Sequence, residues 1–191
     1  MSHSPAMNAR AAILAVALLA VAAGHSEFAY ASDDAVFANY NSTNRVCESD
    51  GSGGFVCSDV SADQNSTGGV ALGHIDGDPH IDAVFANQDQ PNLVCFGDGV
   101  GGFANCAEVS TDEDFSKAVA LGYINGDQSL DIVFANLNDP DRVCLGDGGG
   151  GFNCSAVSAE TRQTTAVALG LVDGDANLDA VFGDLGVNRV C

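Results

Sequence analysis

The strongest constraint on this 191-residue chain is an internal repeat with a period of about 48 residues. The segment Ala83–Asn87 reads AVFAN, and close copies of it occur at 35–39, 132–136 and 180–184. Cysteines follow the same period, since four of them are separated by 48, 49 and 47 residues: Cys47, Cys95, Cys144 and Cys191. A fixed period of this size is typical of solenoids and propellers rather than of a chain with one central core.

Each period predicts four short strands and no helix. In the second period, residues 70–72 and 83–86 are apolar on both faces, as in strands buried between stacked sheets. Residues 93–96 and 103–106 follow, bounded by Gly, Asp and Asn turn signals. Four strands per period are typical of a propeller blade, whereas the alternative, an open β-solenoid, usually has shorter repeats. We therefore expect an all-β, propeller-type array of four-stranded blades with about three and a half repeats, at roughly 33–68, 69–117, 118–165 and 166–191.

Residues 1–31 have the three parts of a secretory signal peptide. Arg10 precedes an apolar run at 11–23, and Ala29-Tyr30-Ala31 supplies a small-residue cleavage site, with Ala23 as the alternative. The run is shorter than the roughly 20 residues that span a bilayer, which argues against the alternative of a membrane tether. We expect the repeat domain, 32–191, to be secreted without membrane insertion after cleavage, and seven cysteines fit an oxidising compartment.

The charge balance excludes two classes of partner. The chain has 26 Asp and Glu residues against 6 Lys and Arg residues, which gives a formal net charge of −20. A surface of this kind cannot neutralise the phosphates of a nucleic acid or of an anionic membrane. No nucleic-acid partner is expected.

The repeat copies also serve as an internal control for catalysis, because a catalytic residue is usually unique and a structural one recurs. The histidines of the repeat region, His74 and His80, do not recur, yet no serine or cysteine nucleophile has a recognisable motif or a histidine partner. Paired carboxylates for glycoside hydrolysis stay open as an alternative, although nothing singles out a pair. The sequence predicts a protein that is not an enzyme.

The segment Gly73–Asp82, GHIDGDPHID, followed by AVFAN, resembles the VCBS/FG-GAP repeat of integrin-α-like propellers, which is found in many secreted bacterial proteins. This resemblance implies an extracellular propeller used for adhesion or ligand binding, sometimes as an accessory module. It also implies a D-x-[DN]-x-D-G-x-x-D loop that commonly holds calcium.

Three loops keep the third, fifth and ninth positions of that pattern but lack its first aspartate and its glycine at position six. Calcium takes 6–8 oxygen ligands, so any site here is expected to be weak. The loss of that glycine also matters, because proline at 79 cannot adopt a positive φ and glutamine or alanine does so at a cost. The alternative is that the Asp-Gly and Asn-Gly pairs are simple hairpin turns. The candidate metal ligands are Asp76, Asp78, Asp82, Asn125, Asp127, Asp131, Asp173, Asp175 and Asp179.

Six cysteines flank glycine-rich turns in matched pairs, which predicts cross-strand disulfides within hairpins. Zinc is the alternative, but the C-x9-C and C-x10-C spacings without nearby histidine are not zinc spacings. Each disulfide closes a short loop and is expected to contribute roughly 2–3 kcal/mol. The predicted pairs are Cys47–Cys57, Cys95–Cys106 and Cys144–Cys154, which leaves Cys191 without a partner in the chain.

Taken together, the sequence predicts a secreted, non-catalytic β-propeller binding or adhesion module, or a fragment of one, stabilised weakly by calcium and bound to an extracellular protein or glycan. A carbohydrate-binding lectin is one alternative, and an accessory domain of an exported enzyme is another. Because the last repeat is incomplete, we expect either a truncated product or self-association of two chains through that repeat.

Overall fold

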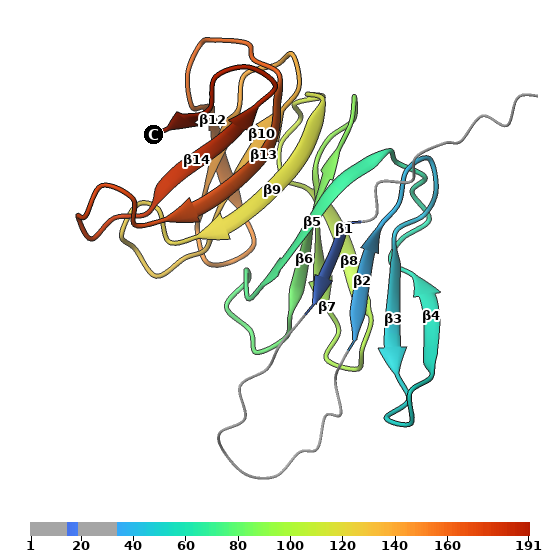
Figure 1. Ribbon diagram of the computed structural model, residues 1–191. Coiled ribbons are helices and arrows are strands. Elements are labelled where there is room, and N and C mark those ends of the chain that lie inside the picture. The colour runs from blue at the N-terminus through green and yellow to red at the C-terminus, as the bar shows by residue number, and fades with distance from the viewer. Residues whose placement is uncertain (1–14, 19–33) are drawn as a thin grey trace, which may run out of the picture.

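The computed structural model describes residues 15–18 and 34–191. These residues are all-β, with no helix and 51% strand, and they form four antiparallel sheets (Figure 1). The all-β prediction is confirmed. No helix long and apolar enough to cross a membrane occurs in these two ranges. Of the expected signal peptide, residues 1–14 and 19–31 lie outside the described residues, while residues 15–18 form a strand.

Each sheet is a meander in which strands adjacent in the sequence pair side by side. The first sheet contains β1 (Ala15–Leu18), β2 (Ala35–Ala38), β3 (Arg45–Ser49) and β4 (Phe55–Asp59). The second contains β5 (Thr67–Gly73), β6 (Asp82–Asn87), β7 (Leu93–Gly97) and β8 (Phe103–Glu108). The third contains β9 (Ser116–Gly122), β10 (Asp131–Asn136), β11 (Arg142–Gly146) and β12 (Phe152–Ala156). The fourth contains β13 (Thr164–Gly170), β14 (Asp179–Asp184) and β15 (Arg189–Val190).

The core lies between the sheets and is centred on the second strand of each one. All six residues of β6 and all six of β10 are buried, as predicted for the apolar run at 83–86. Residues 70–72 of β5 were expected to be buried on both faces as well, but they are only partly buried. Val84, Ile132 and Phe134 belong to one core cluster, so residues of the second and third sheets pack against each other. The sheets are therefore layers that share their apolar faces (Figure 1).

The first strands of successive sheets approach one another closely. A Cβ atom at Gly68 would lie 2.9 Å from the carbonyl oxygens of both Ser116 and Lys117, so only glycine lets β5 lie this near to β9. The same neighbour relation links β1 with β5 and β9 with β13. A single row of first strands thus runs through all four sheets.

The three predicted disulfides are present, and each joins residues directly opposite one another on the third and fourth strands of a sheet. The turn of each hairpin begins with an aspartate whose Oδ1 accepts two backbone N–H bonds, as Asp147 does from Gly149 at 2.8 Å and Gly151 at 2.9 Å. Gly148 and Gly150 adopt positive φ values of 74° and 87°, which explains the glycine-rich sequence. Among the seven cysteines, all of which lie in the described ranges, Cys191 is exposed and forms no disulfide.

Candidate functional site: the loops between first and second strands

Three homologous loops connect the first and second strands of the second, third and fourth sheets. Because they join the same pair of strands in each sheet, they lie at the same end of their sheets. All nine candidate metal ligands belong to these loops or to the residue that follows them. We call them the 74–81, 123–130 and 171–178 loops.

The ninth-position aspartates act as clamps for the backbone. Asp82 accepts a hydrogen bond from Ile75 N to Oδ2 at 2.7 Å and another from Gly97 N to Oδ1 at 2.9 Å. Asp131 makes the equivalent bonds to Ile124 N and Gly146 N, at 2.8 Å and 3.0 Å. Both side chains are fully buried, and they tie the start of each loop to the end of the third strand. Their recurrence therefore has a structural explanation in these backbone hydrogen bonds.

The third and fifth positions fold the loop on itself. Asp78 N donates to Asp76 Oδ1 at 3.1 Å, and His80 N donates to Asp78 Oδ1 at 2.7 Å. The other two loops repeat both bonds, at Asn125 with Asp127 and at Asp173 with Asp175. These are Asx turns, in which the side chain of an aspartate or asparagine accepts the backbone N–H group two residues further on.

One expectation about these loops was wrong. The resemblance implies a positive φ at position six, which Pro79 cannot adopt. The residues with positive φ are instead the glycines at position four, Gly77, Gly126 and Gly174, at 84°, 79° and 89°. Position six is not in the left-handed region, so proline, glutamine and alanine are tolerated there.

The 74–81 loop differs from the others in how closely its acids gather. One oxygen from each of Asp76, Asp78 and Asp82 lies within 4.8 Å of the others, and in the described part of the chain this is the one group of three such side chains. Burial raises the pKa of the Asp82 carboxyl above its ordinary value, the amides of Gly97 and Ile75 oppose that shift, and the charge of Asp76 adds to it. In the 171–178 loop, by contrast, hydrogen bonds from Asn177 lower the pKa of Asp175.

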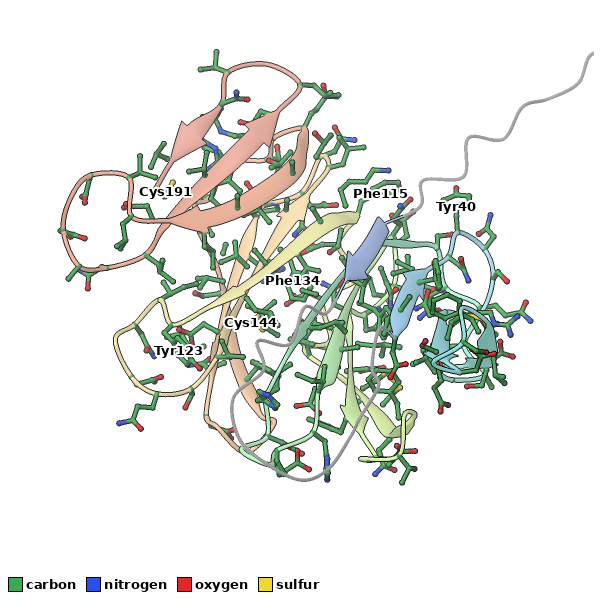
Figure 2. The ribbon with its side chains drawn as sticks, turned by 60° about the horizontal axis from the view of Figure 1, so that its bottom comes forward. Tyr40, Phe115, Tyr123, Phe134, Cys144 and Cys191 are labelled. Carbon is green, nitrogen blue, oxygen red and sulfur yellow. A yellow bond between two sulfur atoms is a disulfide. The ribbon has the colours of Figure 1, made fainter. Side chains whose placement is uncertain are left out.

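The 123–130 loop carries a surface hollow of about 310 Å³, lined by Tyr123, Asp127 and Gln128. Tyr123 is 52% exposed and directly follows β9, at the edge of the third sheet (Figure 2). The preceding Gly122 contacts the fourth sheet, because a Cβ there would lie 2.7 Å from Leu169 Cδ1 and 2.8 Å from Leu178 Cδ1. The hollow therefore borders the junction of two sheets.

This hollow was not predicted, although its signal was present in the sequence. Tyr123 occupies the position of His74 and Leu171 in the other loops, and Gln128 occupies that of Pro79 and Ala176. At these positions the three loops depart from the calcium-loop pattern. The 123–130 loop is the one of the three that combines an aromatic ring, a carboxylate and an amide.

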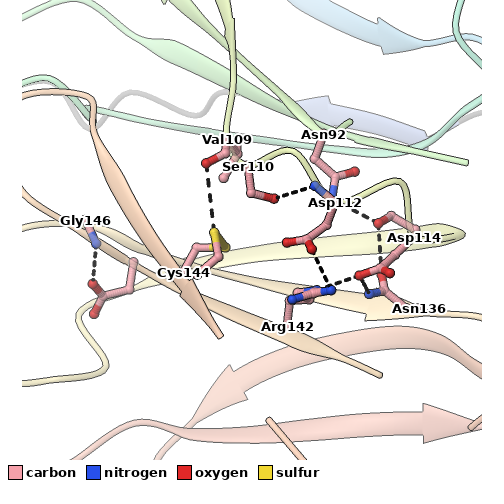
Figure 3. The surroundings of a disulfide bond; sticks show 12 residues. Asn92, Val109, Ser110, Asp112, Asp114, Asn136, Arg142, Cys144 and Gly146 are labelled. Atoms are coloured by element: carbon pink, nitrogen blue, oxygen red, sulfur yellow. Dashed lines mark hydrogen bonds and ion pairs between the residues drawn. A yellow bond between two sulfur atoms is a disulfide. The ribbon is translucent and has the colours of Figure 1, made fainter. Parts of the chain in front are cut away.

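A second missed feature is a row of buried polar ties between sheets. Asn92 Nδ2 donates to Ser116 Oγ at 3.0 Å, and this hydroxyl donates to Asn136 Oδ1 at 2.8 Å. Beside them, Arg142 pairs with Asp114 at 2.6 Å and with Asp112 at 2.8 Å (Figure 3). A single hydroxyl thus links the turn of one sheet with the core strand of the next. These ties connect the second and third sheets through buried polar side chains.

Comparisons with known proteins support the fold and identify no family. No family model matches the chain, and no curated protein matches it. Among solved structures, the chain is similar to a lectin from Agrocybe aegerita that is described as specifically recognising non-reducing terminal N-acetylglucosamine. The two share 16% identity at a TM-score of 0.55 over 82% of this chain. The chain corresponds to 48% of the length of that lectin.

Proposed function

We propose that this chain is a non-catalytic, extracellular glycan-binding module, built as a β-propeller-type array, and that a sugar binds in the hollow at Tyr123. The observation that carries the proposal is the exposed Tyr123 ring beside Asp127 and Gln128, on a fold similar to that of a lectin. Three disulfides among the described residues fit an extracellular location. The lectin alternative of the sequence analysis thus has more support than an adhesin for a protein ligand.

The residues of the hollow match the chemistry of a sugar. A pyranose ring presents an apolar C–H face and a rim of hydroxyl groups, and a tyrosine offers a large, stiff surface for the first of these. Asp127 already accepts Ser129 N on Oδ1 and Asn125 Nδ2 on Oδ2, yet each oxygen keeps a second lone pair for a hydroxyl. Gln128 can both donate and accept. One small site of this kind fits a single sugar residue.

The charge of the protein narrows the class of glycan. At a net charge of −20, a sialylated or sulfated glycan would be repelled on approach. The proposed ligand is therefore a neutral sugar, and terminal N-acetylglucosamine is a suitable first probe.

The test is titration calorimetry of the chain with oligosaccharides ending in N-acetylglucosamine, alongside a glycan array. We expect millimolar to micromolar binding that Tyr123→Ala weakens at least tenfold. Tyr40→Ala is the matched control, because Tyr40 is 56% exposed on the first sheet, far from the hollow (Figure 2). An array with no neutral glycan above background, or equal binding by both variants, would contradict the proposal.

A second proposal concerns calcium in the 74–81 loop alone. Its support is the close approach of Asp76, Asp78 and Asp82. The donor set fits a calcium ion only in part, because both oxygens of Asp82 already accept backbone N–H groups. We therefore propose a weak, stabilising site here and none in the other two loops, which narrows the expectation from sequence.

A further inference from the structure

We propose that the edge of β2 that faces away from β3 is a strand-docking site, and that residues 15–18 of this chain are its occupant. The apolar segment near the N-terminus then has a structural role as the first strand of the first sheet. This role is separate from glycan binding and competes with removal of the segment as a signal peptide.

Residues 15–18 have the same sequence as parts of two other first strands. Residues 15–18 read Ala-Val-Ala-Leu, and so do residues 118–121 of β9 and 166–169 of β13. The match ends there, since Leu19 stands where the other first strands have glycine. The same four residues are thus used three times at the start of a sheet.

The pairing of the first strand with the second has the same register in the first, third and fourth sheets. In the third sheet, Val119 lies opposite Phe134 and Ala120 lies opposite Val133. In the first sheet, Val16 lies opposite Phe37 and Ala17 lies opposite Val36. The fourth sheet pairs Val167 with Phe182 in the same way. A shift by one residue would exchange the faces of the strand, so the shared register places like residues on like faces.

Without β1, the edge of β2 that faces away from β3 would be exposed. Val36 and Ala38 are buried, and the homologous edges of β6, β10 and β14 are each covered by a seven-residue strand. An uncovered edge would present unpaired N–H and C=O groups next to apolar side chains, which is a template for pairing with another chain. With β1 in place, the row of first strands continues from β9 through β5 to the first sheet (Figure 1).

The structure of the first sheet depends on whether residues 15–18 are kept or removed. A chain that keeps residues 15–18 has a complete first sheet, whereas cleavage after Ala31 removes the strand and opens the edge. The opened edge would accept an AVAL strand added from outside, as in recognition by strand addition.

The first experiment uses the full chain, produced without export and oxidised. Ala17→Cys with Val36→Cys places two cysteines opposite one another, and Ala15→Cys with Val36→Cys is the control that is two residues out of register. We expect the first pair to form a disulfide in a non-reducing peptide map and the control to form little. Equal linkage of both pairs, or of neither, would overturn the proposal.

A second measurement does not depend on cysteines. Ala17→Pro removes a backbone donor from β1, and it should lower the melting temperature of the full chain by several degrees relative to Asn8→Pro. The processed chain, 32–191, should melt below the full chain and should be stabilised by a synthetic peptide of residues 12–21 but not by its Val16→Pro form. If the chain that begins at Ser32 melts like the full chain and ignores the peptide, the strand has no structural role.

Discussion

The second strands of the third and fourth sheets have nearly the same sequence and very different surroundings. β10 reads DIVFAN and every residue is buried, whereas β14 reads DAVFGD and, of its six residues, only Phe182 is fully buried. The third sheet lies between two others in the described chain, and the fourth has a neighbour on one side only. Burial in such an array is a property of the interface between repeats, as expected when stability is a sum of nearest-neighbour terms.

The polar ties differ between the same regions. The tie from the first sheet to the second is neutral: Asn44 Nδ2 donates to Thr67 Oγ1 at 3.0 Å, and Thr67 donates to Asn87 Oδ1 at 2.8 Å. In the tie to the fourth sheet, Asp141 and Asp184 replace the two asparagines around Thr164. Arg189 pairs with both carboxylates and lies over the Phe182 ring. The junction with the fourth sheet therefore has carboxylates paired with Arg189 at the two positions where the junction of the first and second sheets has asparagines.

The largest expected effect comes from breaking this charged tie. Arg189→Leu removes the cation from Asp141, whose side chain is only 2% exposed. It also removes one of the two cations near Asp184, which is 4% exposed and still lies 3.7 Å from Arg162. We expect a loss of roughly 3–5 kcal/mol in the free energy of unfolding of the fourth sheet, measured by hydrogen exchange of β13 and β14.

The rescue variant makes that prediction specific. Arg189→Leu combined with Asp141→Asn and Asp184→Asn recreates the residues at the junction of the first and second sheets, which are Asn44, Thr67, Asn87 and Leu93. Most of the lost stability should return. If the triple variant is no more stable than Arg189→Leu alone, the difference between the two ties is not one of charge.

Removal of a disulfide should have the next largest effect on the free energy of unfolding. The loss should be the same in the first sheet and in the second. Cys95–Cys106 and Cys47–Cys57 close loops with sequence separations of 11 and 10 residues. Because closure entropy depends on loop length, replacing either pair by alanine should cost about 2–3 kcal/mol in a urea titration. A much greater loss at Cys95, which is 1% exposed, would show that packing rather than closure dominates.

The repeat period, the strand types and the disulfide pairs could be predicted from the sequence because each depends on local patterns that recur. The alternation of turn glycines and apolar runs determines a hairpin, and a hairpin places Cys144 opposite Cys154. The ties through Ser116 and Thr164 could not be predicted, because each joins groups more than 20 residues apart. The hollow at Tyr123 was missed because Tyr123 and Gln128 stand at positions that vary among the repeats, whereas the repeat pattern predicts only what recurs.

Two valines at the same strand position can show how much the packing between sheets contributes to stability. Val133 in β10 and Val181 in β14 occupy the same strand position, but Val133 is 1% exposed and Val181 is only partly buried. Val133→Ala should cost about 2 kcal/mol, counting two buried carbon groups and a small cavity. Val181→Ala should cost less than about 1 kcal/mol on the same argument. Equal losses in chemical denaturation would mean that the strand itself, not its neighbours, sets the stability.

The carboxyl groups at the 74–81 and 171–178 loops should change the stability of the protein with pH in opposite directions. Burial raises the pKa of the Asp82 carboxyl above 3.8, the value of an ordinary aspartate. The native state therefore binds a proton at Asp82 at a higher pH than the unfolded state does, so the stability should rise as the pH falls from the raised pKa toward 3.8. The pKa of Asp175 is lowered by hydrogen bonds, so its contribution is present above pH 3.8 and is lost as the pH falls through the lowered value. Carboxyl NMR titrations should place the Asp82 midpoint above that of Asp175. The reverse order would remove the basis for treating the two loops as different.

The smallest expected effect is that of calcium, because a weak ligand stabilises the native state only by the logarithm of its concentration over its dissociation constant. At a calcium concentration ten times that constant, the gain is about 1.4 kcal/mol, and the melting temperature should rise by a few degrees relative to chelator. Asp78→Asn removes one of the three gathered carboxylates and should abolish the rise, whereas Asp175→Asn, in a loop without such a group, should preserve it. If both variants keep the rise, calcium binds elsewhere on this acidic surface. If the parent chain shows no rise, the Asx turns alone account for the aspartates, and the loops serve to shape the hollow at Tyr123 rather than to hold an ion.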